Sequence, residues 1–137
     1  MSNIQLPHEL LLNKTIMNWI CIFLGGGLGS ILRYSFSLIS IFQTTGSPLN
    51  TLMANAAASL VLGYLSYTTL NALECSDPIK LGITVGFCGG LSTFSTFSAE
   101  SMDFLQSGQL ISFCIYAIGS IIVCLFAFLI GIKLAGA

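Results

Sequence analysis

Long stretches without a charged side chain are the feature that most restricts how this chain can fold. They run from Thr15 to Tyr34 with only Arg33 interrupting, from Tyr34 to Leu73, from Leu81 to Ala99, and from Phe104 to Ile132. Each stretch reaches or approaches the roughly 20 residues that a helix needs to cross the hydrocarbon core of a bilayer. The sequence therefore predicts an all-α membrane protein with four transmembrane helices, near Ile16 to Ile41, Leu49 to Leu70, Pro78 to Glu100 and Leu110 to Leu134.

The composition agrees with this class, because only 7% of the residues are charged, whereas a soluble domain carries roughly 25%. The four helices form one domain over residues 16–134, between a polar tail at 1–15 and a short end at 135–137. The tail lacks the positively charged start and the small-residue cleavage site of a signal peptide. The net charge of -1, without any run of lysine or arginine, argues against nucleic-acid binding.

The lysines bear on the orientation of the chain in the membrane. If the chain crosses four times, Lys14, Lys80 and Lys133 fall on one side, and only Arg33 lies toward the other. Because the cytoplasmic ends of membrane helices are enriched in lysine and arginine, both termini are expected in the cytoplasm.

The third segment carries a glycine cluster followed by a repeated hydroxyl, hydroxyl, phenyl triplet. Its sequence from Gly86 to Ser98 is GFCGGLSTFSTFS. On a helix the repeat makes three rows: Ser92, Ser95 and Ser98; Thr93 and Thr96; Phe94 and Phe97. Each glycine loosens a helix by about 1 kcal/mol relative to alanine. The cluster therefore predicts a break in the third helix near the middle of the membrane.

The other segments hold a few residues that stand out at membrane depth. Gly25 and Gly29 have the GxxxG spacing that lets two helices approach closely. Placing the charged side chain of Arg33 within a membrane costs free energy. Arg33 therefore either belongs to a functional site or extends its guanidinium group to the membrane–water interface. Asn55 lies among small residues, where it either joins two helices or lines a polar path. Tyr116 and Ser120 lie four apart on one helix face, although each hydroxyl can instead bond a backbone carbonyl.

Several kinds of chemistry are excluded by what the sequence lacks. The single histidine, His8, lies in the tail, and no HExxH, paired CxxC or phosphate-binding loop is present. Acidic side chains are confined to the tail, a loop with Glu74 and Asp77, and an interface with Glu100 and Asp103. A transporter of protons or metal cations is expected to have a carboxylate near the midplane. The sequence therefore argues against an enzyme and against these transporters.

What remains in the interior is a set of uncharged hydrogen-bond donors, with Arg33 toward one end. Donors stabilise anions, and the edge of a phenyl ring carries partial positive charge. Hydroxyl groups beside the rims of Phe94 and Phe97 thus offer a path for a small anion that loses its hydration shell. Aromatic side chains at helical spacing also serve simple packing, so both interpretations stay open on this evidence alone.

At these positions the chain resembles the small bacterial fluoride channels called Fluc or CrcB. Four passages carry the likeness and span all four segments: Gly25 to Tyr34, Asn50 to Asn55 with Gly63, Gly86 to Ser98, and Tyr116 with Ser120. The third passage looks like the family signature and is specific. One departure is Ser92, where the family commonly has threonine.

The resemblance implies a passive, fluoride-selective channel in the bacterial inner membrane that lets cytoplasmic fluoride leave the cell. It also implies a homodimer of subunits inserted in opposite orientations in the lipid bilayer, with two pores at the subunit interface and a structural sodium ion (Na+) at the centre. The residues corresponding to the fluoride pore are Phe94, Phe97, Asn55, Thr96, Tyr116 and Ser120. The two phenyl rings would contact fluoride beside the amide, and the three hydroxyls would form a track along which it moves.

Four further residues receive roles from the same resemblance. The backbone carbonyls of Gly89 and Ser92 would bind sodium at the broken third helix, where irregular backbone is tolerated because it is buried in protein. Glu100 would lie near a pore mouth. Arg33 would contact either the anion or a neighbouring carbonyl.

Two other functions fit four apolar helices. A small multidrug transporter would need a glutamate in its first membrane helix, where this chain has Arg33. A membrane scaffold without transport would use the small residues only for packing. Substitution of Phe94 or Phe97 separates the scaffold from a channel, because only the channel would lose an activity.

Overall fold

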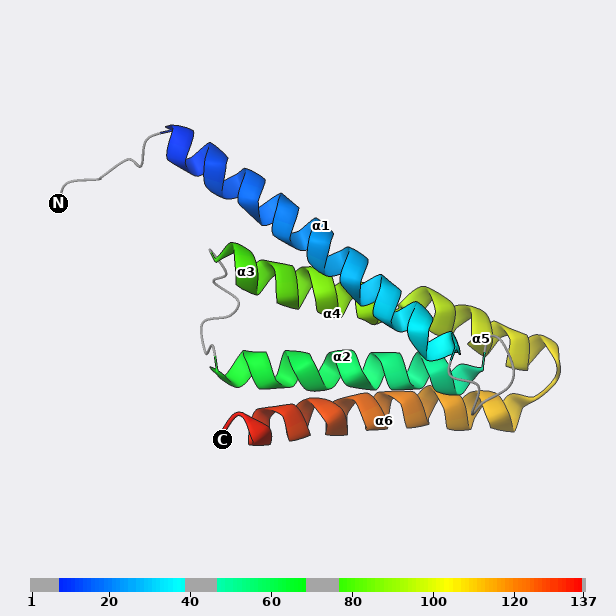
Figure 1. The fold of residues 1–137 in the computed structure, drawn as a ribbon. Helices are drawn as coiled ribbons and strands as arrows, with labels where there is room; N and C mark the ends of the chain where they lie inside the picture. Colours follow the sequence, from blue (N-terminus) through cyan, green and yellow to red (C-terminus); the bar gives the residue numbers. More distant parts are fainter. Residues whose placement is uncertain (1–7, 39–46, 69–76, 137) are drawn as a thin grey trace.

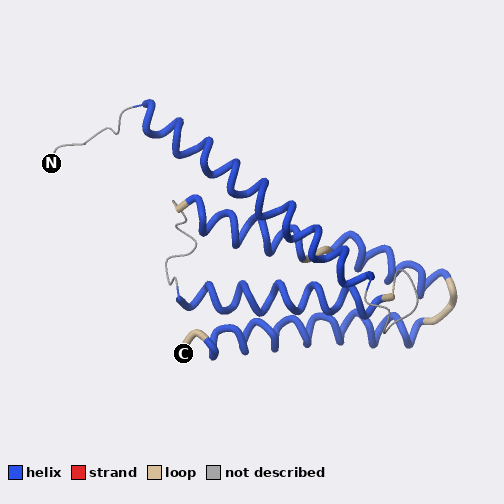
Figure 2. Tube along the Cα trace, viewed as in Figure 1, coloured by secondary structure: helices blue, strands red, loops and turns tan. Residues whose placement is uncertain are grey.

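The structure, a computed structural model, describes residues 8–38, 47–68 and 77–136, and every regular element within these ranges is helical. Figures 1 and 2 show the helices as a ribbon and as a tube. The elements in chain order are α1 (His8–Leu38), α2 (Pro48–Thr68), α3 (Pro78–Leu81), the π-helix η2 (Gly82–Phe87), α4 (Cys88–Leu91), α5 (Phe94–Gln106) and α6 (Leu110–Leu134). The prediction of an all-α chain is confirmed.

The helices run alternately up and down the bundle. In Figure 1, α1 and the continuous path through α3, η2 and α4 run in one direction, while α2 and α6 run in the other. α2 packs along α6, and α1 packs against η2 and α4. The start of α1, the start of α3 and the end of α6 lie at the same end of the bundle, which is the end that carries Lys14, Lys80 and Lys133.

The bounds of two helices differ from the sequence prediction. α1 begins at His8 instead of near Ile16, because Glu9 faces the positive end of the helix dipole and three leucines follow it. The last part of the expected tail is therefore helical. The third segment continues past Glu100 to Gln106. The predicted helix ends at residues 39–41 and 69–70 lie outside the described residues, as do residues 1–7.

Two helices within the described ranges are long and apolar enough to cross a membrane. They are Glu9–Leu38 and Leu110–Leu134, with mean hydropathies of 1.6 and 2.7, and few of their residues are buried inside the chain. α2 is not one of this pair, and alanine, serine and Asn55 fill its middle. Together with α2 and the broken third segment, these helices form one apolar bundle.

Glycines bring the backbones of neighbouring helices into contact. A Cβ atom added at Gly25 would collide with the carbonyl oxygen of Gly82, and one added at Gly29 would collide with that of Phe87. The predicted close approach at these two glycines is thus confirmed. The buried core is correspondingly built from small side chains such as Ala54 and Ala58, and Leu91 is the one large side chain among the described residues that is fully buried.

The third segment breaks two residues after its glycine cluster. Asp77 caps its start by accepting a hydrogen bond from the Ile79 N–H at 3.0 Å, and Pro78 occupies the first turn. The glycines remain helical within η2 and α4, because α1 packs tightly against them. The chain leaves the helix at Ser92 and Thr93, both of which are extended, and α5 starts at Phe94. The break is confirmed, and it lies within the stretch from Gly86 to Ser98 that predicted it, after the glycines rather than among them.

A substitution at Gly29 tests the packing of α1 on α4. We expect Gly29→Ala to lower the free energy of unfolding by about 1–3 kcal/mol, because the added methyl group overpacks the contact with Phe87. Gly27→Ala is the matched control, since no atom lies within 4 Å of a Cβ at Gly27. Thermal unfolding in detergent, followed by Trp19 fluorescence, measures both. Equal unfolding temperatures for the two variants would contradict the assigned contact.

Candidate functional site

The side chain of Asn55 holds the backbone at the break. Its Oδ1 accepts a hydrogen bond from the Thr93 N–H at 2.7 Å, and its Nδ2 donates to the Thr93 carbonyl at 3.3 Å. An asparagine amide has two N–H donors, so the second one is left over after these two bonds. Asn55 therefore joins α2 to the broken segment and still has a donor to offer.

The break removes the helical donors of two carbonyl groups. In a continuous helix the Thr93 N–H would donate to the Gly89 carbonyl, but it donates to Asn55 instead. The Thr96 N–H would likewise donate to the Ser92 carbonyl, but it donates to the Thr93 hydroxyl, which caps α5. Gly89 is exposed, with no atom within 4 Å of a Cβ placed there. The two carbonyls that the family resemblance implies as sodium ligands therefore lack the donors that a continuous helix would give them.

A cavity of about 300 Å³ lies beside the break, and we name it the Phe97 cavity. Its lining residues come from α2, the break, α5 and α6: Asn55, Ser59, Ser92, Thr93, Phe94, Phe97, Ser120, Ile121 and Cys124. None of these lining residues, all within the described part of the chain, is acidic. Ser120 is 6% exposed, and its Oγ has no hydrogen-bond partner among the described residues.

Aromatic rings form a row that starts at this cavity with Phe94 and Phe97 and continues away from it. The ring centroids of Phe94 and Phe97 are 5.6 Å apart, and those of Phe97 and Tyr116 are 5.1 Å apart. Tyr116 also meets Phe104 edge-on at 5.9 Å. Phe97 is half-buried, whereas Phe94 is 78% exposed. Most of the Phe94 side chain is therefore left uncovered by the described part of the chain.

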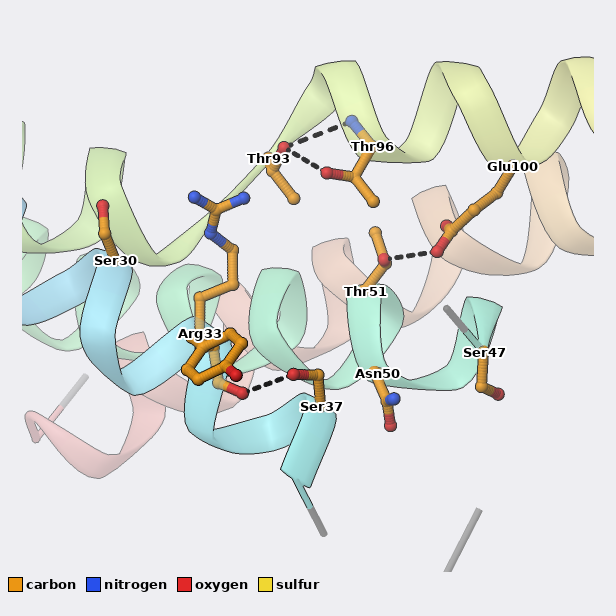
Figure 3. Close-up of a pocket in the computed structure, with 10 residues that line it drawn as sticks. Ser30, Arg33, Ser37, Ser47, Asn50, Thr51, Thr93, Thr96 and Glu100 are labelled. Carbon is orange, nitrogen blue, oxygen red and sulfur yellow. Dashed lines mark hydrogen bonds between the residues drawn. The ribbon is translucent and has the colours of Figure 1, made fainter. Parts of the chain in front are cut away.

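A second cavity, of about 250 Å³, lies between α1, the start of α2 and α5, and we name it the Arg33 cavity. Figure 3 shows that the Arg33 guanidinium points from α1 toward the segment that carries Thr93. The Arg33 Nε is buried and has no hydrogen-bond partner within the described ranges. Thr96 and Glu100 line the same cavity from α5. Thr93 lines both cavities, so its backbone forms part of the wall between them.

Glu100 is buried within the chain, a feature that the sequence did not predict. Only 9% of Glu100 is exposed. Its Oε1 accepts a hydrogen bond from the Thr51 hydroxyl at 2.8 Å, and its Oε2 accepts one from the Tyr116 hydroxyl at 2.5 Å. Two hydroxyl donors compensate the carboxylate for lost water. The result is a bridge across α2, α5 and α6.

The predicted site residues separate into two groups in space. Asn55, Phe94, Phe97 and Ser120 meet at the Phe97 cavity, and Ser92 lines it as well. The Arg33 cavity holds Arg33, Thr96 and Glu100. Tyr116 packs on Phe97, but its hydroxyl is directed to Glu100. The predicted row of three serines is wrong at its first member, because Ser92 lies outside the helix.

Sequence reasoning missed two residues that organise the site. Thr51 is 6% exposed and bonds Glu100. Thr93 caps α5 and separates the cavities. Its signal was readable, because a threonine directly before a run of helix-forming residues is a preferred cap. Nothing in the sequence alone pairs Thr51 with a residue so distant along the chain.

A bundle of apolar helices with polar cavities at a helix break defines a helical membrane protein. The family described as "CrcB-like protein, Camphor Resistance (CrcB)" matches residues 20–132, and the chain belongs to this family. That match covers most of α1 and all the other described helices except the last residues of α6.

Curated relatives cover most of the chain. A protein of Phocaeicola vulgatus named "Fluoride-specific ion channel FluC" is 42% identical over 115 residues, which is 82% of this chain and 93% of that protein. "Fluoride-specific ion channel FluC 1" of Staphylococcus aureus is 38% identical over 128 residues, which is 93% of this chain and 85% of that protein. "Fluoride-specific ion channel FluC 2" of Staphylococcus saprophyticus is 36% identical over 118 residues, which is 86% and 96% of the two chains.

Amide hydrogen exchange tests the hydrogen bonds between Asn55 and the Thr93 backbone at the break. We expect Asn55→Ala to speed exchange of the Thr93 N–H about fivefold or more, since the loss of a net hydrogen bond is worth about 1 kcal/mol. Mass spectrometry of the purified protein measures this. Ser59→Ala is the control, because the Ser59 hydroxyl bonds only the Asn55 carbonyl. If Thr93 exchanges at the same rate in both variants, another group protects it.

Proposed function

We propose that this protein is a fluoride-selective ion channel through which cytoplasmic fluoride leaves the cell passively, reducing its toxicity. The observation that carries the proposal is the meeting of Asn55, Phe94, Phe97 and Ser120 at one cavity without a carboxylate. The names of the relatives, each a fluoride-specific ion channel, point to the same ion.

The Phe97 cavity supplies donors suited to a small, strongly hydrated anion. The free N–H of Asn55 and the unpartnered Ser120 hydroxyl can each donate a hydrogen bond to it. The edges of Phe94 and Phe97 add partial positive charge. An anion that enters therefore exchanges its water shell for donors and ring edges, and no negative group on the cavity wall repels it.

The Arg33 cavity provides an approach to that site. The unpaired Nε of Arg33 leaves this guanidinium able to attract an anion into the cavity. Thr93 and Thr96 carry hydroxyls on the side toward the break, 3.1 Å apart. Glu100 lies in the same cavity, where the hydroxyls of Thr51 and Tyr116 donate hydrogen bonds to both oxygens of its carboxyl group. We infer that the anion passes from Arg33 along Thr96 and Thr93 to the Phe97 cavity.

A homodimer is the proposed assembly, with its pores at the subunit interface. Phe94 is 78% exposed although it lines the cavity, so the cavity is open beside this ring, and a second subunit placed there would close it. Four packed helices also leave no lumen of their own. We further propose that each subunit crosses the bacterial inner membrane four times and that the two subunits are inserted in opposite orientations. The three lysines at one end of the bundle favour a single orientation instead.

A structural sodium ion at the break fits the free carbonyls. Gly89 and Ser92 supply two carbonyl oxygens without helical donors, and a second copy related by a twofold axis would supply two more. Bound there, sodium would hold the two breaks together. A density map of the assembly tests both proposals, because a monomer, or sodium away from these carbonyls, would contradict them.

The rival functions have less support. A multidrug transporter needs an unpaired carboxylate for its cation, but both oxygens of Glu100 accept hydrogen bonds. A scaffold does not need an unpartnered, buried hydroxyl such as that of Ser120 beside a cavity.

Ion efflux from proteoliposomes tests the function directly. Vesicles loaded with fluoride should release it once an ionophore dissipates the membrane potential, and a fluoride electrode records the release. Vesicles loaded with chloride should retain it, because a larger anion is poorly matched to the donors and rings of the cavity. Equal release of the two anions would rule out the claimed selectivity.

The phenyl rings give a second test. We expect Phe94→Ile and Phe97→Ile each to lower fluoride efflux at least about tenfold, because an aliphatic side chain has no positive edge to face the anion. Phe23→Ile is the matched control, since Phe23 is 80% exposed on α1 and lines neither cavity. Size-exclusion chromatography checks that each variant assembles. If Phe97→Ile released fluoride as fast as the wild type, the proposal that the rings line the fluoride pathway would be wrong.

A further inference from the structure

One thiol lies on the wall of the Phe97 cavity. Tyr116, Ser120 and Cys124 follow one another at intervals of four residues on α6, so they form a single row along one helix face. Cys124 is half-buried and, like Ser120, lines the cavity. The row therefore consists of two hydroxyl groups followed by a thiol group.

The neighbouring hydroxyl indicates that this part of the cavity takes up a ligand. Ser120 is 6% exposed, yet its Oγ bonds no described residue, and a buried hydroxyl without a partner is costly. Water or a passing ion is the natural partner. The Cys124 thiol lies one turn along the same face, so the same water or ion can reach it. A thiol in contact with water can react, because the reactive form is the thiolate.

The other described cysteines differ from Cys124. Cys88 is 4% exposed and belongs to the core. Cys21 lines an apolar groove with Leu24, Gly25 and other residues of α1, α3 and η2. Cys114 is exposed on α6 and lines neither the Phe97 cavity nor the Arg33 cavity.

We propose that Cys124 is a modification site for small thiol-directed electrophiles, and that its conversion to a mixed disulfide closes the Phe97 cavity. The closure rests on the proposed function of this cavity, whereas the modification itself does not. Substituents attached to the sulfur share a space of about 300 Å³ with Ser120 and Phe97.

The reaction is defined for methyl methanethiosulfonate, a small and neutral reagent. The Cys124 thiolate attacks the sulfur that carries the methyl group, and a disulfide bond forms between these two sulfur atoms. The bond from that sulfur to the sulfonyl sulfur breaks, and methanesulfinate leaves with the electron pair. The thiol proton passes to the buffer. A thiol such as dithiothreitol reverses the change by reducing the disulfide.

Fluoride efflux with and without the reagent tests the proposal, with each variant compared to itself. In the wild type we expect the reagent to lower efflux about tenfold or more, because a group fixed in the pathway excludes the ion. Dithiothreitol should restore the efflux. Cys124→Ser should lose this sensitivity, whereas Cys114→Ser should keep it. Inhibition that persists in Cys124→Ser would overturn the assignment.

Peptide mass spectrometry of the wild type provides a readout independent of that variant. The fraction of Cys124 carrying a methylthio group should rise in step with the loss of efflux as the dose increases. Complete modification of Cys124 with unchanged efflux would overturn the closure. If the untreated protein releases no fluoride, the proposed function fails, and labelling alone decides the site. In that case, modification of Cys114 without modification of Cys124 would overturn the assignment of Cys124 as the modification site.

Discussion

The pair of hydrogen bonds from Asn55 to the Thr93 backbone is the interaction on which the site depends. A helix that stops within a membrane leaves donors and acceptors that lipid cannot satisfy. Asn55 satisfies one donor and one acceptor with a single side chain. The break therefore has a fixed position on α2, and the residues before and after it acquire fixed directions.

The direction of α5 then determines what each cavity contains. Thr93 caps the helix, and Thr96 and Glu100 follow three and seven residues later on the face toward the Arg33 cavity. Phe94 and Phe97 follow one and four residues after the cap, on the face toward the Phe97 cavity. One short helix thus presents hydroxyls and a carboxylate to one side and aromatic rings to the other.

The sequence predicted the helical class, the close approach at Gly25 and Gly29, the existence of a break and the grouping of Asn55 with the phenyl rings. The first three follow from local periodicity and residue type, whereas the grouping of Asn55 with the phenyl rings was implied by the family resemblance. The position of the break was not predictable from glycine content, because packing against α1 keeps Gly86 and Gly90 helical despite their low propensity. Burial of Glu100 was equally hidden, since its partners Thr51 and Tyr116 lie on other helices.

The uncovered face of the site follows from the same geometry. Apolar side chains such as Leu125 and Ile130 on α6 are exposed at no cost in lipid. A cavity lined by Asn55 and Ser120 is different, because polar groups facing hydrocarbon would lose their hydrogen bonds to water. Phe94 lies at its margin with most of its surface uncovered. Lipid cannot satisfy the polar groups of this cavity, so either protein or water must, and this requirement is the physical reason for proposing a second copy of the chain at this face.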